Sequence, residues 1–269
     1  MIYKPLPQNS MLISTARKDN VPMPNYPITQ SPNHRITESP NHRITESPNH
    51  LIAIIGGTGK EGNAIAARFA KAGVRVLIGS RDAAKAQNAA NELNARVGAS
   101  NVEGYANRDA TARAEIVLLA VPYAGMTPIL EDIRDAAQGK IVINVASSLD
   151  PERKSRAKPP AAGSVTAEVQ QFFGDAVKVV CAFQNIAPEK LESVEEKIDT
   201  DVIVCGNDKD ARATVIDLIR RIGIDAFDGG ALANAVAVEA LTAILIAVNI
   251  KYKVRGAGIR ITGVPRESA

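Results

Sequence analysis

A glycine-rich segment, residues 56–62, carries the residues best spaced for chemistry and reads Gly-Gly-Thr-Gly-Lys-Glu-Gly. We expect Gly57 to allow a tight turn, Gly59 to let the backbone approach a pyrophosphate, and Gly62 to let a helix pack closely on a strand. Free backbone amides at the start of the following helix would face the phosphate charge. The segment therefore predicts a dinucleotide-binding turn, provided that a strand precedes it and a helix follows it.

A second group, Gly79, Ser80 and Arg81, follows about twenty residues on, where NAD-binding proteins usually carry an acid for the ribose hydroxyl. A carboxylate would repel a 2′-phosphate, whereas a hydroxyl and a guanidinium can hydrogen-bond and neutralise it. The pair favours NADP(H) over NAD. Other interpretations stay open: Ser80 as the N-cap of the next helix, Arg81 as a solvated charge, and Asp82 as either the cap or a ribose contact.

The elements that position these groups follow from an alternation of apolar runs and helical stretches that begins at residue 51. This alternation predicts an α/β, NAD(P)-binding Rossmann fold, a doubly wound and mostly parallel sheet with a C-terminal helical extension. The expected strands are 51–55, 74–78, 101–105, 115–121, 140–145, 177–183, 201–205 and 224–227. The expected helices are 61–72, 82–96, 124–137, 164–174, 208–222 and 231–252.

Ligands bind at the carboxyl ends of the strands in such sheets. Strand 115–121 ends in Val121, Pro122 and Tyr123, and strand 140–145 ends at Ala146 and Ser147. Both ends are expected to face the nicotinamide half of a cofactor, although each is also compatible with a plain turn.

Residues 51–269 contain no histidine. This excludes histidine acid–base catalysis, Ser-His-Asp triads and histidine-ligated zinc from that part of the chain. Hydride transfer between two bound cofactors needs no such group. We therefore predict no catalytic side chain and no metal site.

Three tandem octapeptides, 28–35, 36–43 and 44–51, set residues 1–50 apart. Their Pro- and Asn-rich composition cannot bury a core, so a disordered extension is expected. A metal-binding tract at His34, His42 and His50 is the alternative, but an eight-residue spacing with a proline in each unit does not preorganise a site. The remaining chain is divided into an NADP-binding domain, 51–206, and an α/β segment, 207–269, that completes the substrate site and a dimer interface.

Composition limits the partners and the compartment. A net charge of +3, 4% aromatic residues and no tryptophan argue against nucleic acid. Cys181 and Cys205 lie in apolar runs, so we expect buried reduced thiols and a cytoplasmic protein. No signal peptide is recognisable. The most apolar stretch, 240–248, is expected to be far too short for a bilayer, so no membrane partner is predicted.

Two basic segments are either solvated surfaces or a clamp for an anionic ligand. The first is residues 150–160, which include Arg153 and Lys154. The second is the tail, with Lys251, Lys253, Arg255 and Arg260. Between them, helix 231–252 is apolar almost all round, which indicates burial in a core or a homodimer interface. Glu239 within this helix is either a paired structural carboxylate, which we favour, or a substrate contact.

Taken together, these residues resemble the NADPH-dependent reductases of the deazaflavin coenzyme F420 over residues 51–269. The resemblance rests on residues 55–62, Gly79-Ser80-Arg81 with Lys85, Val121-Pro122-Tyr123, residues 201–206, residues 232–242 and the tail 252–260. It implies that Thr58, Gly59, Lys60 and Glu61 hold the pyrophosphate, that Ser80, Arg81 and Lys85 hold the 2′-phosphate, and that Tyr123 and Thr127 line the cofactor cleft.

The resemblance also implies that loop 182–186 borders the deazaflavin. Archaeal members carry a histidine there, where this chain has Gln184. Gln184 and Asn185 offer neutral amides to a flavin-like ring, or simply close the strand. The expected activity is hydride transfer from NADPH to coenzyme F420. The alternatives are an NADPH-dependent reductase of a flavin, quinone or small carbonyl compound, and a non-catalytic NADP-sensing module.

Overall fold

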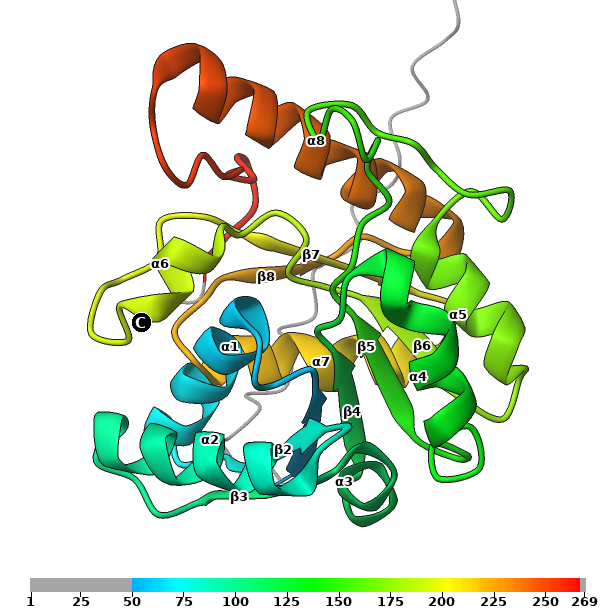
Figure 1. Cartoon of the computed structure of the whole chain (residues 1–269). Coiled ribbons are helices and arrows are strands. Elements are labelled where there is room, and N and C mark those ends of the chain that lie inside the picture. Colours follow the sequence, from blue (N-terminus) through cyan, green and yellow to red (C-terminus); the bar gives the residue numbers. More distant parts are fainter. Residues whose placement is uncertain (1–49, 267–269) are drawn as a thin grey trace, which may run out of the picture. The chain divides into compact units, whose positions relative to one another are not determined.

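The computed structural model describes residues 50–266, which form an eight-stranded sheet with the strand order β3-β2-β1-β4-β5-β6-β7-β8 (Figure 1). The strands are β1 (Leu51–Ile55), β2 (Arg75–Ser80), β3 (Val102–Ala106), β4 (Ile116–Leu119), β5 (Ile141–Asn144), β6 (Lys178–Cys181), β7 (Val202–Gly206) and β8 (Ala226–Asp228). All eight predicted strands are present. The order reverses between β1 and β4, which is the doubly wound arrangement that the alternation predicted.

Helices cover both faces of the sheet. They are α1 (Lys60–Lys71), α2 (Ala83–Val97), α3 (Asn107–Arg113), α4 (Met126–Ile133), α5 (Val165–Phe173), α6 (Pro188–Glu192), α7 (Lys209–Arg221) and α8 (Ala235–Tyr252), with 3₁₀ turns η1 (Tyr123–Gly125) and η2 (Leu232–Asn234). The sequence analysis missed α3 and α6. Only α6 had a usable signal, because Pro188 occupies its first turn. The buried residues of α3, Asn107, Ala110 and Thr111, are small or polar and give little apolar periodicity.

The core lies on both sides of β1. Ile52 and Ile54 pack with residues of α1, α2 and α7 in one apolar cluster, whereas Ala53 and Ile55 pack with residues of α4 and α5 in another. Because successive side chains of a strand point to opposite faces, a strand buried on both sides reads as an unbroken apolar run. This is why β1 could be located from sequence.

One strand pair departs from the parallel pattern. Strand β7 runs antiparallel to β6, and Cys181 lies opposite Cys205 in the register. The connection between these strands carries only the short helix α6 and no full crossover helix, so the chain direction reverses. Both cysteines are buried free thiols, as predicted.

Helix α8 leaves the interface alternative of one expectation open and contradicts another. It exposes Val236 (39%), Ile244 (57%) and Ile250 (67%), so it is not buried within this chain's own core. The prediction that its apolar stretch is far too short for a bilayer is wrong for the helix as a whole. Among the described residues, Leu232–Tyr252 form one helical segment that is long enough and apolar enough to cross a membrane, by length and composition alone.

The predicted N-terminal extension, including His34 and His42, lies outside the described residues. His50 is the exception, and its ring Nδ1 lies 2.7 Å from the Glu115 carboxylate. No cluster of three or more metal-ligating side chains occurs between residues 50 and 266.

Candidate functional site

The glycine-rich turn joins β1 to α1 as the sequence predicted, but the left-handed residue is Gly56 and not Gly57. Gly56 has φ +82°, and a Cβ there would lie 2.4 Å from the Ala120 carbonyl oxygen. A Cβ on Gly62 would lie 2.6 Å from the Gly56 oxygen, so this glycine allows α1 to start against the turn. Gly59 caps α1 without any side-chain hydrogen bond. The first amides of α1 are therefore available to an anion.

The tip of β2 lies beside this turn. The Gly56 amide donates to the Gly79 carbonyl (3.2 Å), and β1 and β2 are parallel neighbours. The role of Asp82 is settled: its Oδ1 accepts from the amides of Ala84 (2.9 Å) and Lys85 (3.2 Å), so Asp82 is the N-cap of α2.

The predicted phosphate-binding side chains at this tip are accessible. Ser80 Oγ accepts weakly from the Asp82 amide at 3.3 Å. Arg81 and Lys85 are exposed, and their side chains make no hydrogen bond or ion pair with any residue from 50 to 266. Arg81 and Lys85 are therefore unpaired among the described residues, and they lie next to a turn with available amides. This arrangement suits a phosphate ester.

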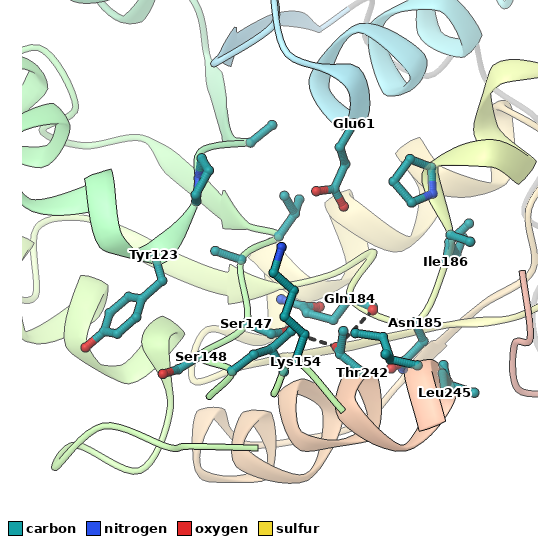
Figure 2. Close-up of a pocket in the computed structure, with 18 of the residues that line it drawn as sticks. Glu61, Tyr123, Ser147, Ser148, Lys154, Gln184, Asn185, Ile186, Thr242 and Leu245 are labelled. Carbon is teal, nitrogen blue, oxygen red and sulfur yellow. Dashed lines mark hydrogen bonds between the residues drawn. The ribbon is translucent and has the colours of Figure 1, made fainter. Parts of the chain in front are cut away.

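A cavity of about 960 Å³ opens at the carboxyl ends of the central strands. Its walls come from the start of α1, the segment after β4, the long loop after β5, the loop after β6, and α8 (Figure 2). Of the predicted site residues, those that line it are Gly59, Lys60, Glu61, Val121, Pro122, Tyr123, Gln184 and Asn185. Those that do not line it are Gly57, Thr58, Gly62, Ser80, Arg81, Lys85 and Thr127.

Hydrogen bonds hold one wall of the cavity together (Figure 2). Thr242 of α8 donates its hydroxyl proton to the Gln184 carbonyl (3.0 Å), so Ser147, 2.9 Å away, donates to the Thr242 oxygen. Gln184 Nε2 in turn donates to the Asn144 carbonyl (2.7 Å). Sequence reasoning had not assigned Thr242 to the site, because nothing local marks a threonine of an apolar helix as a cavity residue.

Two buried acceptors in this wall lack a partner. Gln184 Oε1 and Asn185 Oδ1 make no hydrogen bond within the described part of the chain. Their residues are only 6% and 3% exposed, and both line the cavity. An unpaired buried acceptor is costly. Both oxygens have almost no accessible surface of their own, so the N–H donors of a ligand, such as a carboxamide or an imide ring, would reach them only after this wall moves.

Two ionisable groups of the cavity are strongly perturbed. Burial, helped by a 2.8 Å hydrogen bond from its hydroxyl to Glu168, raises the pKa of Tyr123 to about 12, so Tyr123 keeps its proton at neutral pH. Burial alone raises the pKa of Glu61 to about 7. Its neighbour Lys60 is directed toward α6, where its ammonium lies 2.6 Å from Glu189. The side chains of Lys60 and Glu61 are thus poorly suited to a pyrophosphate, and the turn offers its backbone amides instead.

Glu239 ties α8 to the start of α5. Its carboxylate accepts from the amides of Val165 (2.8 Å) and Thr166 (2.9 Å) and from the Thr166 hydroxyl (2.7 Å). These bonds satisfy the free amides at the start of α5. This agrees with the structural role expected for Glu239.

The two basic segments separate in space. Lys154 and Lys158 of the loop after β5 line the cavity, whereas Arg153 does not. None of the four tail cations lines it, and Arg260 instead lies 3.8 Å from the buried Asp201. The loop therefore favours a clamp for an anionic ligand more directly than the tail, which lines the cavity through Ala257 and not through a cation.

Comparison with known proteins points to one family. Residues 51–148 match the family model described as NADP oxidoreductase coenzyme F420-dependent. The F420-dependent NADP reductase of Methanocaldococcus jannaschii is 38% identical over 221 residues, which cover 79% of this chain and 98% of that protein. The protein of the same name from Methanothermobacter thermautotrophicus is 38% identical over 223 residues, covering 80% and 96%.

A solved structure agrees as well. A protein from Arthrobacter sp. FB24, provisionally named an F420 dependent NADP-reductase, superposes with a TM-score of 0.69 at 26% identity and covers 79% of this chain and 99% of its own.

Proposed function

The chain belongs to the F420-dependent NADP reductase family, and from that premise we propose that it transfers a hydride between NADPH and the deazaflavin coenzyme F420. The observation that carries this proposal is the cavity at the strand ends. One side of it begins at a phosphate-binding turn, and the other ends at two buried acceptors without partners. A dinucleotide fits the first side, and the nicotinamide and deazaflavin rings fit the second, against the wall to which Gln184 and Asn185 contribute.

Each part of the cofactor has a proposed binding site. The amides of Thr58, Lys60, Glu61 and Gly62 hold the pyrophosphate, since those of Gly57 and Gly59 donate within the turn. Ser80, Arg81 and Lys85 hold the 2′-phosphate. Val121, Pro122, Tyr123 and Thr127 border the cofactor cleft, while Gln184 and Asn185 contact the second substrate. In this assignment residues 51–206 form the NADP-binding domain, and residues 207–269 complete the substrate site.

The chemistry resides in the two cofactors, which supply a hydride donor and a hydride acceptor when bound. The chain's contribution is to hold the two rings in contact within one cavity and to exclude water from it. The apolar wall formed by Val121, Ile186 and Leu245 serves the exclusion of water. The high pKa of Tyr123 disfavours the alternative in which this tyrosine donates a proton to a carbonyl substrate.

Turnover of NADPH with coenzyme F420 tests the function directly. We expect oxidation of NADPH only when F420 is present, with loss of the visible F420 absorbance, and little activity with NADH. Free flavin, a quinone and a small aldehyde serve as comparison acceptors. Tight NADPH binding without turnover of any acceptor would instead identify an NADP-sensing module, and preference for another acceptor would identify the alternative reductase.

Lys154 and Arg153 provide a matched pair for locating the second substrate. Coenzyme F420 carries a phosphate and glutamates, and only Lys154 of this pair lines the cavity. We expect Lys154→Glu to raise the KM for F420 about tenfold, whereas Arg153→Glu, with the same change in charge, raises it by less than about twofold. Steady-state kinetics at saturating NADPH measure both. Equal effects would show that the loop acts through its overall charge and not through the cavity.

We also propose a cytoplasmic homodimer in which α8 packs against a partner subunit. The exposed apolar side chains of α8 support an interface, because a surface of this kind is normally covered. We expect light scattering to give twice the chain mass, and Ile244→Glu to halve it, while Ala213→Glu at an exposed position of α7 leaves it unchanged. A monomeric unmodified protein, or one recovered with membranes, would contradict this assembly.

A further inference from the structure

We propose that the side chain of Glu61 exchanges the proton that accompanies hydride transfer, holding it while the nicotinamide is reduced and releasing it when the ring becomes positively charged. This inference rests on the proposed function and adds a role for a side chain that the fingerprint by itself would assign to phosphate binding. Three features of the structure lead to it: where the carboxyl points, what surrounds it, and what the reaction requires.

The carboxyl of Glu61 points into the cavity. Glu61 is the second residue of α1, and Figure 2 shows its side chain directed from the helix toward the cavity wall that carries Gln184 and Asn185. It makes no hydrogen bond or ion pair with any residue between 50 and 266. An unpartnered carboxyl in a partly buried cavity has no structural task comparable to that of Glu239.

No surrounding charge compensates Glu61. On its own helix, Lys60 is engaged with Glu189 (2.6 Å) and Glu192 (3.7 Å) of α6. From η1, Tyr123 is neutral and bonded to Glu168. From the loop after β5, Lys154 extends into the same cavity (Figure 2), which Asp150 and Lys158 also line, and none of the three forms an ion pair or hydrogen bond with Glu61.

Removal from water therefore dominates the titration of Glu61, and this desolvation places its pKa at about 7. Near that pH the side chain is both a competent donor and a competent acceptor of a proton.

The reaction needs such a group. Two electrons travel with the hydride, so a C–H bond of the nicotinamide breaks and one on the deazaflavin forms. The reduced deazaflavin takes up one further proton at a ring nitrogen, and the nicotinamide is left with a positive charge. Residues 51–269 contain no histidine to supply that proton, and Tyr123 retains its own at neutral pH.

Charge couples the two events. A carboxylic acid beside a newly formed cation is acidified, because its ionised form now has an opposite charge nearby. The O–H bond of Glu61 breaks, the proton goes to the reduced substrate, and the carboxylate remains opposite the positive ring. In the reverse direction Glu61 takes the proton back as the ring loses its charge.

Proton linkage of nucleotide binding tests this without turnover. NADP⁺ and NADPH carry the same phosphates and differ in ring charge, so comparison of the two isolates the ring. Calorimetric titration of each nucleotide at pH 7 in two buffers of different ionisation enthalpy gives the protons released. We expect NADP⁺ to release up to about half a proton more than NADPH, since a group of pKa about 7 is half protonated there.

Variants identify the group responsible. Glu61→Gln keeps the shape of the side chain, and Glu61→Leu suits apolar surroundings if the amide does not fold. Both should abolish the difference between NADP⁺ and NADPH, whereas Glu131→Gln on the exposed face of α4 should retain it. The inference is overturned if the unmodified protein shows no difference, or if Glu61→Gln retains it. If the inference is overturned in either way but the protein still turns over NADPH with F420, the proposed function stands. If neither NADP⁺ nor NADPH binds, the proposed function and this inference are both overturned.

Discussion

Replacing Arg81 with Asp and Ser80 with Ala should weaken NADPH binding about 100-fold or more, while NADH binding changes little. The substitution replaces a charge-assisted hydrogen bond with repulsion, an effect of about 3 kcal/mol or more. The structure strengthens the argument because Arg81 is exposed and makes no ion pair with a described residue that the change would disrupt. Asp82, the cap of α2, stays in place. Fluorescence titration with each nucleotide measures the result.

The matched control for this prediction is Arg75→Asp, at the opposite end of the same strand. Arg75 is also exposed, so the variant makes the same change in net charge away from the turn. We expect it to leave the affinity for NADPH within about twofold of the unmodified protein. If the unmodified protein binds NADH and NADPH equally, the assignment of Ser80 and Arg81 to the 2′-phosphate is wrong.

Glu61→Gln should stabilise the unliganded protein at high pH and have no effect at low pH. Burial raises the folded-state pKa of Glu61 from 4.5 to about 7, so the folded state binds more protons than the unfolded state between these values. The free energy of unfolding therefore falls as pH rises through this window, and the loss is complete above pH 7. It amounts to about 3 kcal/mol. The glutamine variant does not titrate and escapes this loss.

Urea unfolding at pH values from 4 to 8 measures this difference. The free energy of unfolding of Glu61→Gln, relative to that of the unmodified protein, should show a gain near zero at pH 4. This gain should grow between pH 4.5 and 7 and stay constant above pH 7. Glu131→Gln, which removes a carboxylate from the surface of α4, should show no such growth. A gain that is the same at every pH would mean that the glutamine packs better, and that the carboxyl of Glu61 is not perturbed.

Local patterns predicted most of the fold. The run from Leu51 to Ile55 and the turn that follows it depend on neighbouring residues only, and both were located correctly. The short helix α3 was missed because its buried face consists of small and polar residues, which give a weak periodic signal.

Contacts between distant residues could not be read from the sequence. Buried Arg68 of α1 donates to the carbonyls of Lys190, Leu191, Ser193 and Glu196, far along the chain. Likewise, the family resemblance implies that Lys60 and Glu61 are phosphate-binding residues. Only the tertiary structure shows one paired with α6 and the other directed into the cavity.

The wall that α8 contributes has a consequence for synthesis. Thr242, Leu245 and Asn249 close the cavity from the last helix, whereas the turn that begins at Gly56 is among the first described segments to leave the ribosome. A growing polypeptide thus presents the turn at Gly56 early and the α8 wall of the cavity last. Premature termination before α8 would yield a product that retains the turn but lacks Thr242, Leu245 and Asn249, so its cavity would stay open on that side.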